Sequence, residues 1–145
     1  MQLFPSLTLE EGWALIAAGV DESKRMGVAQ NLAVVDAFGH LLCFVRMDGA
    51  NRLAAEIAVN KAVTAAATGV ATEIIAPRTI PGEPGYMIQT QCAGRFTTIG
   101  GGAPVLCDGA TLGALGVSGG SVAQDVEIAA AVVLAFQPEN CPARE

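Results

Sequence analysis

The sequence predicts an α+β fold in which helices pack on the faces of a single antiparallel sheet. Two β-rich runs, 32–36 and 41–47, are separated by four residues that include Gly39, which suits the left-handed position of a hairpin turn. Hairpin strands pair antiparallel. The expected order is helix, hairpin, helix, long loop, strands and helix, unlike the regular alternation of a doubly wound nucleotide fold. We expect one domain over residues 1–145.

The first helix is expected to begin after Thr8 and to run to about Met26. Thr8 and Glu11 have the spacing of a capping box, and Gly27 is a typical stop. The periodicity indicates which side of this helix faces the core: Trp13, Ile16, Ala17 and Val20.

A second, alanine-rich helix is expected from Leu53 to about Thr68. It carries one polar stripe, and its other faces are apolar or small, so it is either central or packed against another subunit. The stripe consists of Glu56, Asn60, Thr64 and Thr68, with Lys61 beside it.

Residues 76–95 are expected to form a long loop because proline and glycine recur throughout them. Loops of this length in compact domains usually serve a function or cover something. This one contains Arg78, Tyr86, Met87, Gln89 and Cys92. The remaining strands are expected at 96–99, 105–107 and 111–117, with a turn at 108–109.

A glycine corner, Ser118-Gly119-Gly120, follows the last expected strand. Ser121 then caps a helix whose first turn contains Asp125. The backbone N–H groups of such a corner could bind an oxygen-bearing ligand. More often, however, glycines occur at these turns because the backbone needs a positive φ or because neighbouring atoms pack closely. The final helix is expected to bury Val122, Val126, Ala129, Val133 and Phe136, and the tail 138–145 is expected to be mobile.

Composition narrows the classes of partner. The net charge of -6 and the lack of a Lys/Arg cluster argue against nucleic acid and anionic membranes, and leave small molecules or proteins. No signal peptide or membrane-spanning run is recognisable, so we expect no membrane association and a cytoplasmic location. Only 15% of residues are charged, which favours a homo-oligomer with surface buried between subunits.

The four cysteines include no C-x-x-C pair, so the sequence indicates neither a zinc site nor a thioredoxin-type motif, and we expect no metal site. Buried, reduced thiols are the expected state.

Several motifs, in this order and spacing, resemble the GlcG/HbpS family, also called DUF336. The matching residues are Asp36-x-x-Gly39, Arg46-x-Asp48, Lys61-Ala62-x-Thr64-Ala65, Gly101-Gly102-x-Pro104 and Gly113-x-x-Gly116-Val-Ser-Gly-Gly120 with Gln124-Asp125. The resemblance implies a profilin-like α+β fold, oligomeric assembly and, for some members, haem binding. This chain departs from the family pattern directly after Asp125: members usually have an acidic residue there, and this chain has Val126.

Related domains occur in glycolate-utilisation operons and at the C-terminus of some cobalamin adenosyltransferases of the PduO type. This chain is too short to contain the separate transferase domain as well. A corrinoid activity is therefore not inferred from the resemblance.

Haem binding requires an apolar slot, an axial donor and cations for the propionates. His40 is the candidate donor, although a turn histidine more often faces solvent. Arg46 and Lys61, together with Arg78 and Arg95, are candidate propionate partners, although such side chains are commonly solvated or paired. The pocket is expected between the long loop and residues 100–104, and its backbone-lined part is assigned to Gly101, Gly102, Ser118, Gly119 and Gly120.

The hypothesis is a small-ligand-binding protein of the GlcG/HbpS type, with haem as the candidate cofactor, that assists the use of small metabolites such as glycolate, glycerol or propanediol. Two alternatives remain. Acid and base groups such as Glu56, Lys61, Asp125 and Glu127 leave open an enzyme acting on a small metabolite, although their spacing specifies no reaction and no catalytic residue. A purely structural oligomer would bind no ligand.

Overall fold

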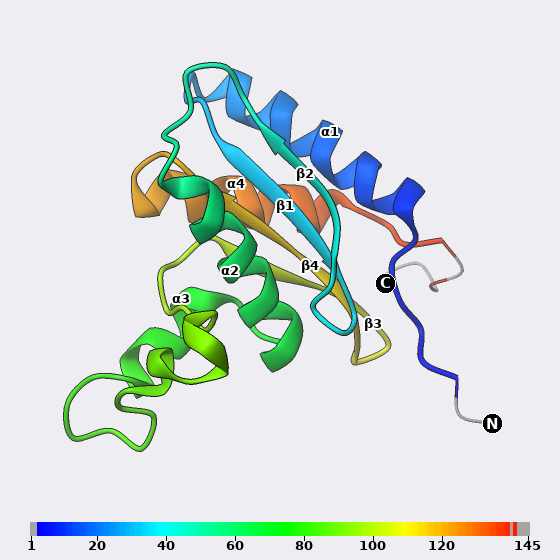
Figure 1. Ribbon diagram of the computed structural model, residues 1–145. Coiled ribbons are helices and arrows are strands. Elements are labelled where there is room, and N and C mark those ends of the chain that lie inside the picture. The colour runs from blue at the N-terminus through cyan, green and yellow to red at the C-terminus, as the bar shows by residue number, and fades with distance from the viewer. Residues whose placement is uncertain (1–2, 140, 142–145) are drawn as a thin grey trace.

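The computed structural model describes residues 3–139 and 141, and these form one four-stranded antiparallel sheet with helices on both faces (Figure 1). The strands have the spatial order β2-β1-β4-β3, so β1 and β4 are central. Their bounds are β1 (Asn31–Asp36), β2 (Leu41–Arg46), β3 (Gly102–Cys107) and β4 (Ala110–Ser118). The predicted α+β class and the single antiparallel sheet are confirmed.

The two faces of the sheet are covered by different helices. α1 (Leu9–Arg25) and α4 (Val122–Ala135) cover one face, and α2 (Ala54–Thr68) covers the other. In β1, Leu32 and Val34 join the cluster under α1 and α4, whereas Ala33 and Val35 join the cluster under α2. This alternation follows from the two-residue period of a strand.

α2 lies unusually close to the sheet because small residues meet on both sides of the contact. A Cβ atom added to Gly116 would collide with the carbonyl oxygen of Ala58, and one added to Gly102 would collide with that of Lys61. The helix contributes Ala58, Ala62, Ala65 and Ala66 to this layer. The alanine-rich composition of α2 therefore serves close packing within the domain.

The inward faces of α1 and α4 differ only in part from the prediction, since Ile16, Ala129 and Val133 are buried as expected. Trp13 is 50% exposed and Ala17 is exposed, whereas Leu15 and Ile16 are buried. Two glycines explain the rotation of α1: Gly12 lies against Cys43, and Gly19 lies against Leu32. In α4, Val122 is exposed and the buried residues are Asp125, Ile128, Ala129, Val132 and Val133.

The segment between α2 and β3 contains no strand, so the strand expected at 96–99 was wrong. Side-chain hydrogen bonds hold this segment instead: the Thr97 amide donates to Thr64 Oγ1 over 2.9 Å, and Thr72 Oγ1 donates to the Ile99 carbonyl over 2.8 Å. The rest consists of α3 (Thr72–Ile75) and three short 3-10 helices, η1 (Ala76–Arg78), η2 (Ile88–Thr90) and η3 (Cys92–Gly94).

The expectation of four reduced, buried thiols was also wrong. Cys107 and Cys141 form a disulfide, and Cys92 is an exposed thiol. Cys43 is buried as expected, and burial raises the pKa of its thiol to about 11. Mobility of the tail 138–145 stays a prediction, but the disulfide fastens its described residue Cys141 to the end of β3.

Among the described residues, no helix combines the length and the apolar character that crossing a bilayer requires.

Candidate functional site

A buried ion pair joins α2 to the first turn of α4. Lys61 Nζ lies 2.8 Å from Asp125 Oδ2 and donates a second hydrogen bond, 2.7 Å long, to the Val117 carbonyl. The Lys61 side chain is 0% exposed and that of Asp125 is 4% exposed. A charged pair at this depth needs further hydrogen bonds to offset its lost hydration.

The glycine corner and Gln30 supply those hydrogen bonds. Gln30 Nε2 donates to Asp125 Oδ1 over 2.8 Å, and the Gly120 amide donates to the same oxygen over 3.0 Å. Gly120 also lies 3.2 Å from Gln30 Oε1, and Gln30 is fully buried. The Asp125 carboxylate therefore already accepts a hydrogen bond from the Gly120 N–H group, one of those expected to bind an external ligand.

Burial lowers the pKa of Lys61 below its ordinary value, and the nearby carboxylates of Asp125 and Glu73 oppose that shift. Glu73 Oε2 is itself buried, and none of the described residues donates a hydrogen bond to it. Two carboxylates therefore act on one buried ammonium group. This cluster is enclosed and charged, which suits it to holding α2, β4 and α4 together.

The structure brings most of the predicted site residues to this cluster. A Cβ on Gly101 would lie 3.0 Å from Lys61 Nζ, and Gly102 packs on the Lys61 backbone. Ser118 is buried at the end of β4, and its carbonyl accepts a hydrogen bond from Asn31. Gly119 has a φ of 150° and packs against Gln30, which leads the chain into the corner at Gly120.

His40 and Arg46 lie apart from this cluster. His40 is on the β1–β2 turn, its side chain is 81% exposed, and its Nδ1 is 3.5 Å from Asp36 Oδ2. Arg46 is exposed at the end of β2. Neither of them lies beside Lys61 or Asp125.

A separate hollow of about 770 Å³, which we call the loop groove, lies between the end of α2, α3 and the long loop. In Figure 1 this loop extends beyond α3, away from the sheet. The groove walls are mainly apolar, and two charged side chains lie on them. The principal lining residues are Val70, Ile74, Arg78, Glu83, Ile88 and Phe96.

The loop groove shares only one wall with the expected pocket, whose position stays a prediction. The long loop lines the groove, but residues 100–104 are not among its lining residues. Gly100 packs against Val126 of α4 and Gly102 against the Lys61 backbone of α2, so this segment lies between those helices and away from the groove. A smaller recess of about 240 Å³ adjoins the groove, shares Pro84, Gly85 and Ile88 with it, and is also lined by Tyr86 and Met87.

Several large apolar side chains on the groove walls and in the loop beside them are accessible to water. Ile74 is 62% exposed, Ile80 is 55% exposed and Tyr86 is 52% exposed. Exposed apolar groups gathered around a hollow mark a binding surface more often than scattered ones do. The loop groove is therefore the candidate ligand site.

The sequence did not identify Gln30, and Asp125 was considered for the first helical turn and as an acid group of an enzyme, but not as the partner of Lys61. Gln30 gave no local signal, since it precedes a strand and has no motif around it. The unusual presence of Lys61 in an otherwise alanine-rich helix was the available signal for a buried pair, but it did not identify the partner.

Comparison with known proteins agrees with this fold. The family model described as "Haem degrading protein HbpS-like" matches residues 7–133. Corrinoid adenosyltransferase PduO of Citrobacter freundii is 35% identical over 131 residues, which are 90% of this chain and 39% of that protein. The chain thus spans about two fifths of the length of this curated relative.

Two solved structures extend the comparison. Klebsiella pneumoniae protein ORFY, of family DUF336, superposes with a TM-score of 0.89 at 32% identity, covering 94% of this chain and 97% of that one. The structure of a complex of PduOC with haem gives a TM-score of 0.86 at 32% identity, covering 94% and 99%.

Proposed function

The chain belongs to the HbpS-like family, and from this premise we propose that it binds haem in the loop groove. The observation that carries the proposal is the groove itself. It has a volume of about 770 Å³, its walls are mainly apolar, and one cationic side chain, that of Arg78, lies on them. Its size lies within the range of pockets that hold cofactors. The family description and the haem complex of PduOC support haem as the ligand class.

The groove residues fit the chemistry of haem. Val70, Ile74 and Phe96 offer apolar contacts to the porphyrin faces, and the Arg78 guanidinium suits a propionate carboxylate. Glu83 places a carboxylate on the same walls, whose oxygen atoms can bind a metal ion. When bound, haem supplies an iron that exchanges electrons and binds small ligands.

His40 is not part of this proposal. It lies on the β1–β2 turn, whereas the groove is lined by residues from Thr68 to Phe96. None of the described lining residues is a histidine. The proposed haem site therefore depends on the walls of the groove and on Arg78.

The wider role that we propose is an accessory one in the use of small metabolites, as the family resemblance implies. We also propose a homo-oligomer, since Trp13 on α1 and Leu134 on α4 are 50% and 74% exposed. A cytoplasmic location stays a proposal from the sequence. The Cys107–Cys141 disulfide counts against it, because disulfides persist mainly in oxidising compartments.

The test is a titration of the apo-protein with haemin, followed in the Soret region. We expect a saturable, stoichiometric band. Arg78→Ala should raise the Kd about tenfold, because one charge-assisted hydrogen bond contributes roughly 1.5 kcal/mol.

Two exposed residues outside the groove provide matched controls. Arg46→Ala removes a guanidinium at the end of β2, and His40→Ala removes the imidazole of the turn. Both variants should leave the Kd unchanged. An unsaturable signal would reject haem binding, and a Kd that depends on His40 but not on Arg78 would place haem outside the groove.

A further inference from the structure

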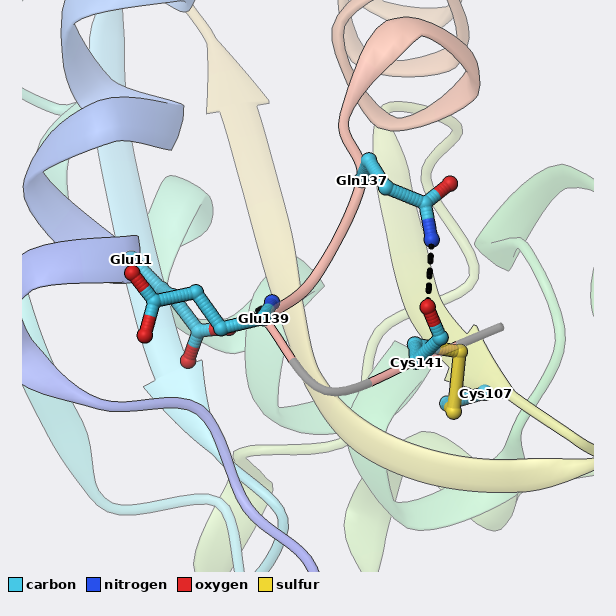
Figure 2. Close-up of a disulfide and its surroundings, with 5 residues drawn as sticks. All are labelled: Glu11, Cys107, Gln137, Glu139 and Cys141. Atoms are coloured by element: carbon cyan, nitrogen blue, oxygen red, sulfur yellow. Dashed lines mark hydrogen bonds between the residues drawn. A yellow bond between two sulfur atoms is a disulfide. The ribbon is translucent and has the colours of Figure 1, made fainter. Parts of the chain in front are cut away.

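The disulfide lies partly outside the portion of the chain that the family model covers. That match ends at residue 133, whereas Cys107 at the end of β3 is bonded to Cys141. The two Cα atoms are 5.8 Å apart, and 34 positions separate the residues in the sequence (Figure 2). One of the two bonded cysteines therefore lies beyond the residues that the family model matches.

The same C-terminal segment is hydrogen-bonded to the beginning of α1. The Glu139 amide donates to Glu11 Oε1 over 2.8 Å. The other oxygen of Glu11 accepts from the Thr8 amide over 2.8 Å and from Thr8 Oγ1 over 3.0 Å, which completes the capping box of α1. One carboxylate thus joins the N-cap of α1 to the tail (Figure 2 shows Glu11 beside Glu139).

Phe136 packs against the core cluster under α1 and α4 and is held there without the disulfide, so the question concerns Pro138, Glu139 and Cys141. Pro138 is buried, and Gln137 Nε2 donates to the Cys141 carbonyl over 3.0 Å, which is a contact within the segment itself. Fixing several residues after the end of a helix costs conformational entropy for each of them. One hydrogen bond to a carboxylate and one buried proline are little to offset that cost.

We propose that the Cys107–Cys141 disulfide is a redox-operated latch that holds residues 138, 139 and 141 against the start of α1. Both cysteines are half-buried and lie outside the core clusters of buried residues. Cys43, by contrast, is buried in the core. When the disulfide is reduced, the segment leaves Glu11, and α1 loses the contact that joins its first turn to the tail.

The reductant is a dithiol. One of its thiolates attacks a sulfur of the disulfide, forms a mixed disulfide and releases the other cysteine as a thiolate, which takes up a proton. The second thiol of the reductant then breaks the mixed disulfide and closes the reductant's own disulfide. Two electrons and two protons pass to the protein, and Cys107 and Cys141 become thiols.

The experiment measures amide hydrogen exchange in the wild-type protein with and without dithiothreitol, with the thiol count taken by mass spectrometry. On reduction we expect the Glu139 amide to exchange at least about tenfold faster, since it loses its carboxylate acceptor. The Leu53 amide, which donates to Asn51 Oδ1 in an exposed turn at the opposite end of the sheet and opens locally, should keep its rate.

Two variants sharpen the test. Cys141→Ser should show the fast exchange at Glu139 without any reductant, and Cys92→Ser, which alters the exposed thiol, should behave like the wild type. If Cys141→Ser does not fold, the comparison of oxidised and reduced wild type still decides. Equal protection of Glu139 in both states, a disulfide that dithiothreitol does not reduce in the folded protein, or equally accelerated exchange at the Leu53 control would each overturn the proposal.

Discussion

Replacing Lys61 by methionine tests whether the buried ion pair holds α2 to α4. Methionine has a similar length and no charge, so the packing around position 61 is largely kept while the Asp125 carboxylate loses its partner. The variant also loses the 2.7 Å hydrogen bond to the Val117 carbonyl. Removing one partner of a buried pair costs about 3–5 kcal/mol of unfolding free energy.

The geometry favours the lower part of that range. Asp125 Oδ1 keeps its hydrogen bonds from Gln30 and Gly120, at 2.8 and 3.0 Å, so the carboxylate stays partly solvated by the protein. We therefore expect Lys61→Met to lower the unfolding free energy by about 3 kcal/mol. Adding Asp125→Asn removes the unpaired charge and should restore about 1–2 kcal/mol of it.

Urea unfolding at pH 7 provides the measurement, with the midpoint and the m-value compared between variants. Lys24→Met is the matched control, because Lys24 is exposed near the end of α1 and should change stability by less than about 0.5 kcal/mol. If Lys61→Met is as stable as the wild type, the ion pair does not hold these elements together, and the reasoning fails.

Three further outcomes are expected. Gly116→Ala should cost about 1–3 kcal/mol of unfolding free energy in urea, because the added Cβ would collide with the Ala58 carbonyl. The control Gly82→Ala should cost about 1 kcal/mol, because its Cβ meets no atom within 4 Å and only its φ of +93° is strained. An equal loss at both positions would contradict the close-packing account. Cys141→Ser should lower the unfolding free energy by roughly 3–4 kcal/mol, as chain entropy gives for a separation of 34 residues, and a loss below about 1 kcal/mol would show that the disulfide adds little. Burial lowers the pKa of Lys61 below 10.5, so the unfolded chain binds the lysine proton more tightly than the folded protein does. The contribution of Lys61 to stability should therefore rise with pH between the lowered pKa and 10.5. If the unfolding free energy of the wild type minus that of Lys61→Met falls over this alkaline range, the direction of the shift is wrong.

The elements fixed by short-range chemistry could be predicted from the sequence. Both capping boxes, Thr8 with Glu11 and Ser121 with Gln124, are present in the structure. The turn at Asp108 also formed as expected, with positive φ at Asp108 and at the glycine that follows it. Each of these features depends on residues within three positions of one another.

The errors share a different cause. Trp13 was assigned to the core from helical periodicity, but two glycines let α1 approach the sheet on another side. The run at 96–99 has the composition of a strand, yet β4 is already paired with β1 and β3, and hydrogen bonds to Thr64 and Thr72 hold the run instead. Tertiary packing overrode local preference in both places.

The sequence by itself determined the class of the fold, the hairpin, the helix ends and the family, because caps, turns and periodicity act over a few residues and the family motifs recur in a fixed order. Only the tertiary structure decided which groups meet across the sheet. Lys61 and Asp125 are 64 positions apart, and Gln30 and Asp125 are 95 apart. Their contact, like the partner of Cys141, depends on the strand order β2-β1-β4-β3 and on the close approach of α2, which no local pattern records.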